Sequence, residues 1–201
     1  ARADQAVGHV TIIEENIMKI AYYASGWPIN IGNGFIDYGA LHMIKTAAPD
    51  AQVYCASELA KWVFKANRQD MKRSLDLAEL MDVDYLVVSG MSLCDEFIEV
   101  EGPVLKKLSQ RGVKIVFNGA GGDGYHPKEV DNFRKFMASI NVTAFISRDE
   151  VSYNNFKDLC PVSFNGIDCG FFLSDAFRAA PLLIKDYLVC AIDWMDEPLL
   201  D

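Results

Sequence analysis

Short apolar runs alternate with helical patterns along most of the chain. The runs are rich in β-branched and aromatic residues, with few polar interruptions. This pattern is typical of parallel strands that are buried on both faces. We therefore predict a doubly wound, mostly parallel α/β sheet with helices on both faces, a Rossmann-like fold. Strands are predicted at 19–25, 51–57, 84–90, 113–119, 143–148, 161–168 and 186–193, and helices at 34–47, 58–66, 70–81, 102–111, 127–139 and 149–158.

The first 17 residues, ARADQAVGHVTIIEENI, do not share this rhythm. Met18 opens the stretch MKIAYYAS and leads directly into the first predicted strand. We interpret residues 1–17 as an accessory N-terminal segment or extension, and residues 18–201 as one Rossmann-like α/β domain.

Charge and cysteine usage narrow the function classes. The net charge is −9 and no basic stripe is present, which argues against a nucleic-acid partner. The five cysteines are odd in number, widely spaced and without a CxxC pair, so we expect no disulfide framework, no zinc site and a reducing, cytoplasmic setting. No apolar run is long enough for a transmembrane segment.

Ligands of doubly wound sheets bind outside the carboxyl ends of the strands, so the loops there are the candidate sites. After the first predicted strand, the stretch NIGNGF contains Asn30, Gly32 and Asn33. These residues either cradle a phosphate or form a tight turn in which Asn33 caps the following helix. The sequence favours neither reading.

The loops after the third and fourth predicted strands are rich in glycine. Gly90 follows the third strand, and residues 118–124 contain four glycines in seven positions. So many glycines cost conformational entropy, which favours a functional loop over a mere connection. We expect Gly119, Gly121 and Gly122 to let the backbone approach a ligand. His126 is better explained as an exposed residue beside a turn than as an acid or base.

The stretch ISRDEVS places a cation, Arg148, at the predicted start of a helix, where the helix dipole is already positive. Its neighbours have local explanations, because Ser147 or Asp149 can cap the helix and Ser147 has capping-box spacing to Glu150. A cation there becomes favourable if an anion lies between it and the helix amides. The alternative is an exposed arginine paired with Asp149 or Glu150.

Taken together, these stretches resemble the polysaccharide pyruvyl transferase family over about residues 18–193. The similar segments are Asn30-x-Gly32-Asn33, VVSGMSLCD at 87–95, VFNGAGGDGYHPKE at 116–129, SRDEVSYNNF at 147–156 and SFNGIDCGFFL at 163–173. The closest likeness is between SRDEVS, which includes Ser152, and the R-D-x-x-S signature of the family.

The resemblance implies one half of a GT-B-like architecture, in which the active site lies between two Rossmann-like halves. Members transfer a pyruvyl group from phosphoenolpyruvate to a sugar of a glycan. Arg148 would then hold the anionic donor and Asp168 would lie near the cleft as a second catalytic residue, with no metal or other cofactor. The glycine loops, Asp149 and Ser152 would line the donor site.

Two departures from the family pattern matter. Asn33 stands where the family has aspartate, which removes a carboxylate. No counterpart of the family's second half follows, which leaves a missing second domain or a homo-oligomer open. A non-catalytic Rossmann-like module that binds a nucleotide or sugar, or that assembles with itself, is the alternative. A nicotinamide-dependent oxidoreductase is disfavoured, because no strand is followed by GxGxxG.

Overall fold

In the computed structural model, which describes residues 17–24, 30–57, 76–122, 124–178 and 180, six parallel strands form one sheet. The strands are β1 (Lys19–Ala24), β2 (Gln52–Ser57), β3 (Tyr85–Met91), β4 (Lys114–Gly121), β5 (Val142–Ser147) and β6 (Val162–Asn165). Their order is β2-β1-β3-β4-β5-β6, so the direction of winding reverses between β1 and β3. The predicted α/β, parallel, Rossmann-like fold is confirmed.

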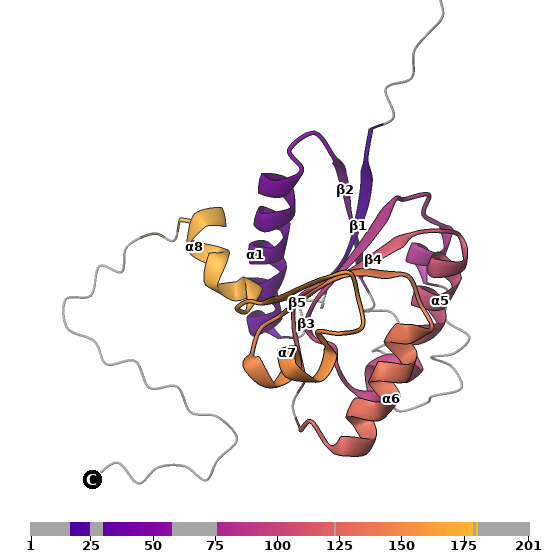
Figure 1. Ribbon diagram of the computed structural model, residues 1–201. Helices are drawn as coiled ribbons and strands as arrows, with labels where there is room; N and C mark the ends of the chain where they lie inside the picture. Colours follow the sequence, from indigo (N-terminus) through magenta and orange to yellow (C-terminus); the bar gives the residue numbers. More distant parts are fainter. Residues whose placement is uncertain (1–16, 25–29, 58–75, 123, 179, 181–201) are drawn as a thin grey trace, which may run out of the picture.

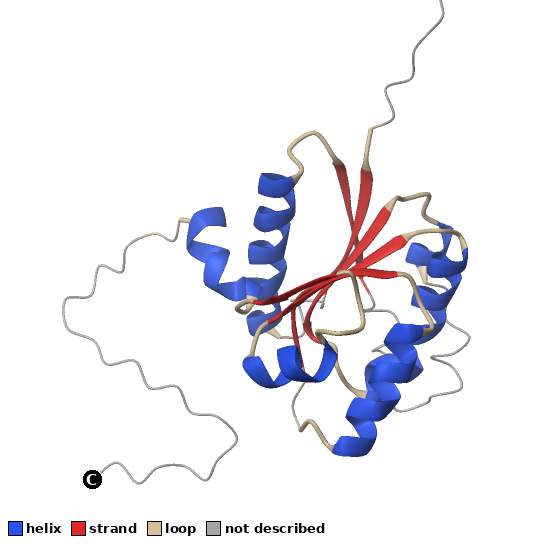
Figure 2. Cartoon of the chain, viewed as in Figure 1, coloured by secondary structure: helices blue, strands red, loops and turns tan. Residues whose placement is uncertain are grey.

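Helices cover both faces of this sheet (Figure 1). The α-helices are α1 (Ile31–Ala47), α4 (Asp95–Val100), α5 (Gly102–Gln110), α6 (Pro127–Ala138), α7 (Glu150–Phe156) and α8 (Leu173–Ala176), and the 3₁₀ helices are η1 (Leu77–Leu80) and η2 (Cys169–Phe172). Figure 1 shows α1 and α8 on one face and α5 and α6 on the other. Figure 2 shows the strands as a twisted fan between these two helical layers.

The strands read as continuous apolar runs because each face of the sheet packs against its own core. In β1, Ala21 and Tyr23 point into the cluster beneath α5 and α6, whereas Ile20 and Tyr22 point into the cluster beneath α1. The larger cluster includes Phe133, whose ring meets those of Phe117 and Phe156 edge to face. Such packing fixes the helices against the sheet and leaves the strand ends free to build a site.

Several sequence predictions need correction at the helix starts. The first helix begins at Ile31 rather than residue 34, so Gly32 and Asn33 lie in its first turn and not in a loop. Asn30, not Asn33, caps this helix, and its side chain accepts a 2.9 Å hydrogen bond from the Gly32 amide. A further helix, α4, occupies residues that we expected in a loop.

The C-terminal predictions are tested only in part. The sixth predicted strand, 161–168, is shorter because Gly166 lies against Ile146 and Ser147 and the chain then turns into η2. The predicted strand 186–193, the predicted helix 58–66 and nearly all of the accessory segment lie outside the described residues. Of the predicted helix 70–81, residues 70–75 also lie outside them, and the described half contains the 3₁₀ helix η1 rather than an α-helix.

Candidate active site at the carboxyl ends of β4 and β5

A kink in β4 shapes the carboxyl edge of the sheet. Asn118 pairs with Ser89 of β3, but the next paired residue of β4 is Ala120, so Gly119 is bulged out of the ladder. The same residue is skipped in the pairing of β4 with β5. Gly119 has φ 62°, and Gly90, which pairs with Ala120 from the neighbouring strand β3, has φ 84°, so both positions favour glycine. The glycines re-aim the ends of two neighbouring strands.

Backbone hydrogen bonds then tie the strand ends together. The Arg148 amide donates to the Ala120 carbonyl at 3.0 Å, and the Ser92 amide donates to the Gly121 carbonyl at 3.0 Å. Arg148, which directly follows β5, is thereby fixed beside the end of β4.

The Arg148 side chain pairs with a carboxylate of the same chain. Its Nη1 lies 3.2 Å from Oδ2 of Asp168, and each side chain is 24% exposed. The other oxygen of Asp168 accepts a 2.8 Å hydrogen bond from the Gly170 amide and so caps η2. The alternative pairing of Arg148 with Asp149 or Glu150 is therefore wrong.

The helix start beside Arg148 is capped locally. Asp149 is the N-cap residue of α7 and accepts a 2.7 Å hydrogen bond from the Ser152 amide. Of the two caps that the sequence allowed, Asp149 is confirmed. Ser147 does not cap the helix, because its hydroxyl bonds to the Phe164 carbonyl and to the Asn165 side chain.

The glycines of the 118–124 stretch allow close approach of the chain to itself. A Cβ on Gly121 would lie 2.3 Å from Nε of Arg148, so the arginine stem crosses the backbone at that position. A Cβ on Gly119 would lie 2.7 Å from Sγ of Cys169. Because Gly39 of α1 approaches the Cys169 carbonyl from the other side, the turn that carries Asp168 is clamped between α1 and β4.

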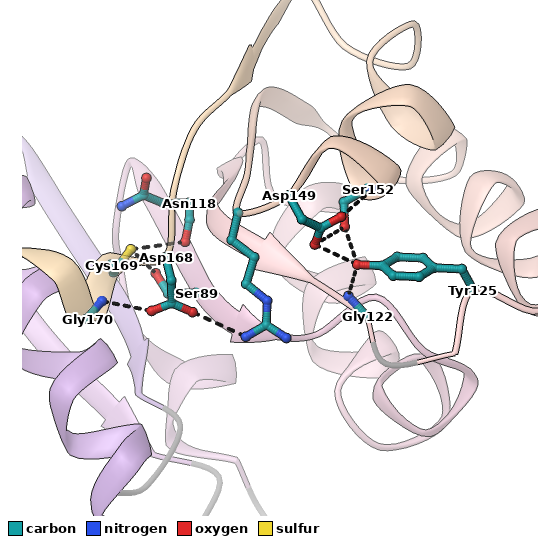
Figure 3. A network of polar contacts seen from close by, with 10 residues as sticks. Ser89, Asn118, Gly122, Tyr125, Asp149, Ser152, Asp168, Cys169 and Gly170 are labelled. Atoms are coloured by element: carbon teal, nitrogen blue, oxygen red, sulfur yellow. Dashed lines mark hydrogen bonds and ion pairs between the residues drawn. The ribbon is translucent and has the colours of Figure 1, made fainter. Parts of the chain in front are cut away.

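A second polar cluster joins the glycine-rich stretch to α7. The Tyr125 hydroxyl accepts a 2.9 Å hydrogen bond from the Gly122 amide and donates a 2.6 Å bond to Oδ2 of Asp149. It also lies 2.6 Å from the Ser152 hydroxyl. Figure 3 marks these contacts with dashed lines. These contacts link Gly122, Asp149 and Ser152 through one phenol.

The local environment sets the protonation of this cluster. Burial, followed by the hydrogen bond to Asp149, raises the pKa of the Tyr125 phenol. Burial opposes ionisation of Asp149, but hydrogen bonds from Ser152 and Tyr125 outweigh it and keep the pKa of this carboxyl below its usual value. The phenol is therefore a neutral donor and Asp149 a carboxylate at neutral pH.

The thiol beneath Asp168 is not built as a nucleophile. Cys169 is fully buried, and its Sγ contacts the Asn118 carbonyl at 3.4 Å and the Ser89 hydroxyl at 3.8 Å (Figure 3). Burial raises the pKa of this thiol to about 11, so the reactive thiolate is scarce at neutral pH. Its role is packing.

The structure brings most of the predicted site residues together. One set of contacts at the ends of β4 and β5 contains Arg148, Asp168, Gly119, Gly121, Gly122, Asp149 and Ser152. Gly90 lies on the neighbouring strand, whereas Asn30, Gly32 and Asn33 form the start of α1. His126 is the N-cap residue of α6, with Nδ1 3.4 Å from the Lys128 amide.

Sequence reasoning missed Tyr125, the residue with most contacts in the second cluster. The available signal was an aromatic residue following the four glycines, which has no purpose in a flexible connection. Nothing in the sequence indicated that it adopts a positive φ of 45°.

Comparisons with known proteins identify no family for this chain. No protein-family model matches the chain, and the curated proteins contain no match to it. Within the described residues, no helix is long and apolar enough to cross a membrane. In the same part of the chain, no three His, Cys, Asp or Glu side chains are grouped so that they could hold a metal ion.

Proposed function

We propose that this chain is polysaccharide pyruvyl transferase-like and supplies the half of the cleft that binds the anionic donor. In this proposal, Arg148 binds the phosphate or carboxylate of phosphoenolpyruvate, and the acceptor is a sugar of a cell-surface glycan. Two sugar hydroxyls add to the enol carbon to form a ketal, and the bond from this carbon to the phosphate oxygen breaks. One hydroxyl proton goes to the methylene carbon, which becomes the methyl group of the ketal, and the other leaves with the phosphate.

The single observation that supports the proposal most is the state of the Arg148 guanidinium. The side chain is three-quarters buried, yet only Nη1 has a hydrogen-bond partner among the described residues. Guanidinium carries five N–H donors in a planar fork, and carboxylate and phosphate match two of them at once. Counting the described residues alone, most of the donors at Arg148 have no protein partner, as an anion-binding guanidinium requires.

The way in which Asp168 is held also supports the proposed donor site. Because it is itself anchored to the Gly170 amide, it fixes one end of the guanidinium without using the whole fork. We assign it the second catalytic role, next to the donor. A preorganised pair of this kind stabilises developing charge without reorganising during the reaction.

Cell location and assembly follow from the same proposal. The four described cysteines are free thiols, which suits a reducing cytoplasm. The rest of the cleft would come from a second domain or a second copy, because the resemblance implies two Rossmann-like halves.

Isothermal titration of phosphoenolpyruvate into the full chain tests the proposal. We expect Arg148→Ala to weaken binding at least tenfold, because a charge-assisted, bidentate contact is lost. Arg134→Ala is the matched control, because Arg134 also pairs with an aspartate, Asp158 at 2.6 Å, but on the surface of α6. Equal binding by wild type and Arg148→Ala would refute the donor site.

The non-catalytic alternative has one observation in its favour. Asn33, where the family has aspartate, lies in the first turn of α1 and offers no carboxylate. Titration of nucleotide-sugars in parallel decides between the two, since a binding module would take these ligands and show no dependence on Arg148.

A further inference from the structure

Tyr125 has a strained backbone that its surroundings must hold in place. Its φ is 45°, and among the described residues it is the sole non-glycine with positive φ. A bulky side chain rarely adopts this conformation, and such outliers persist where neighbouring contacts over-determine them. Gly124, directly before it, has open space where a side chain would lie, so crowding there does not force the conformation.

The contacts that hold Tyr125 come from both sides of Arg148. On one side, the phenol oxygen accepts from the Gly122 amide, and the ring edge lies against Gly122. On the other side, the phenol donates to Asp149, which directly follows Arg148 in the chain.

These two contacts flank the position of the Arg148 guanidinium. The arginine stem crosses Gly121, the residue before Gly122, while the arginine backbone continues into Asp149. One hydroxyl group therefore joins Gly122, the residue after the one that the side chain lies on, to Asp149, to which the Arg148 backbone leads. If this link is cut, the contacts that remain between the two segments, within the described residues, are the pairing of β4 with β5 up to Ala120 and Ser147, the backbone bond from Arg148 to Ala120, and packing.

We propose that Tyr125 is a positioning residue for Arg148, and that its hydroxyl holds the glycine-rich stretch against the start of α7 so that the guanidinium is preorganised for an anionic ligand. The part of this inference that concerns the ligand rests on the proposed function. Preorganisation raises affinity because less ordering remains to be done on binding.

The substitution Tyr125→Phe removes the hydroxyl and keeps the ring. Tyr153→Phe is the matched control, because Tyr153 lies on α7, the helix whose start Tyr125 contacts. Its ring contacts Lys157, and its hydroxyl makes no hydrogen bond within the described part of the chain. Both variants lose one oxygen atom, and only the first loses the link.

The first measurement needs no ligand. In ¹⁵N NMR spectra of the full chain, we expect the Gly122 amide to exchange about tenfold faster in Tyr125→Phe than in wild type. We also expect the Arg148 Nε–Hε signal to broaden or shift towards its free-arginine position. Tyr153→Phe should leave both signals unchanged, and an unchanged Arg148 signal in Tyr125→Phe overturns the positioning role.

The second measurement is the phosphoenolpyruvate titration. We expect Tyr125→Phe to bind about tenfold more weakly than wild type, with Tyr153→Phe equal to wild type. Equal or tighter binding by Tyr125→Phe overturns the inference, because the hydroxyl would then only screen the Gly122 amide. If wild type and Arg148→Ala bind alike, the proposed function fails, and the Arg148 signal alone decides the positioning role.

Discussion

The side chain of Arg148 crosses the backbone of Gly121 so closely that no β-carbon fits between them. A methyl group on Gly121 would lie 2.3 Å from Nε and 2.8 Å from Cγ of the arginine. The neighbour in the way is a flexible side chain, so the arginine, rather than the sheet, would give way.

Gly121→Ala should therefore separate the site from the fold. We expect the free energy of unfolding to fall by only about 1 kcal/mol. Phosphoenolpyruvate binding should weaken about as much as in Arg148→Ala, because the guanidinium is displaced. Thermal denaturation measures the change in stability, and isothermal titration measures the change in binding. A Gly121→Ala protein that binds phosphoenolpyruvate like wild type contradicts the proposed position of the guanidinium over Gly121.

Gly39→Ala should do the reverse and damage the fold first. The new β-carbon would lie 1.8 Å from the Cys169 carbonyl oxygen, and backbone cannot move aside as a side chain can. We expect the unfolding free energy to fall by at least about 2 kcal/mol in urea denaturation. Gly124→Ala is the control, because its β-carbon would meet nothing within 4 Å, and similar losses in both variants would contradict the clamp on η2.

Tyr23→Phe tests a buried polar cluster on the face of the sheet that packs against α5 and α6. The Tyr23 hydroxyl lies 2.5 Å from Oδ2 of Asp76 and also bonds to Glu101, and both acidic residues are buried. Removing a donor that two buried carboxyl groups share should cost about 1 to 3 kcal/mol of stability. Tyr38→Phe, on the exposed side of α1, should cost almost nothing, and equal values would contradict the role of the shared phenol.

The buried thiol of Cys169 predicts a loss of stability at high pH. Its pKa rises from 9.0 to about 11 on folding, because burial disfavours the thiolate. The unfolded chain thus releases this proton at lower pH, and stability falls as pH rises from about 9 to about 11. The loss attributable to this group is roughly 2 kcal/mol.

Comparison of wild type with Cys169→Ala isolates that contribution. Tyr22 and Tyr23 also have raised pKa values, owing mainly to burial, and they give a loss of the same sign in both proteins. Urea denaturation at pH 8, 9 and 10.5 should show a shallower decline for Cys169→Ala. Parallel declines would contradict the assignment to Cys169.

The sheet was predictable because burial on both faces leaves a strong local signal. In β1, Ile20 and Tyr22 fill one core while Ala21 and Tyr23 fill the other, so the whole run is apolar and reads as a strand. The start of α1 was harder, because Gly32 and Gly34 are poor helix formers and masked a helix that Asn30 caps.

Which residues lie together at the ends of β4 and β5 was largely predictable, but their pairings were not. Arg148 stood out because its charge opposes the helix dipole, a conflict visible within a few residues. Its partner Asp168 is twenty positions away, and that pairing depends on the turn at Gly166 and on the bulge at Gly119. The conformation of Tyr125 could not be predicted, because tertiary hydrogen bonds impose it against local preference.

The clamp on the Asp168 turn also has a consequence for the arginine–aspartate pair. The turn is gripped by Gly39 and Gly119, which are eighty residues apart and belong to elements on different sides of the turn. Neither contact exists unless α1 is docked and β4 is in the sheet. Because Asp168 belongs to this turn, the arginine–aspartate pair depends on both elements, and a chain in which either one is displaced would lose the pair while keeping the other strands.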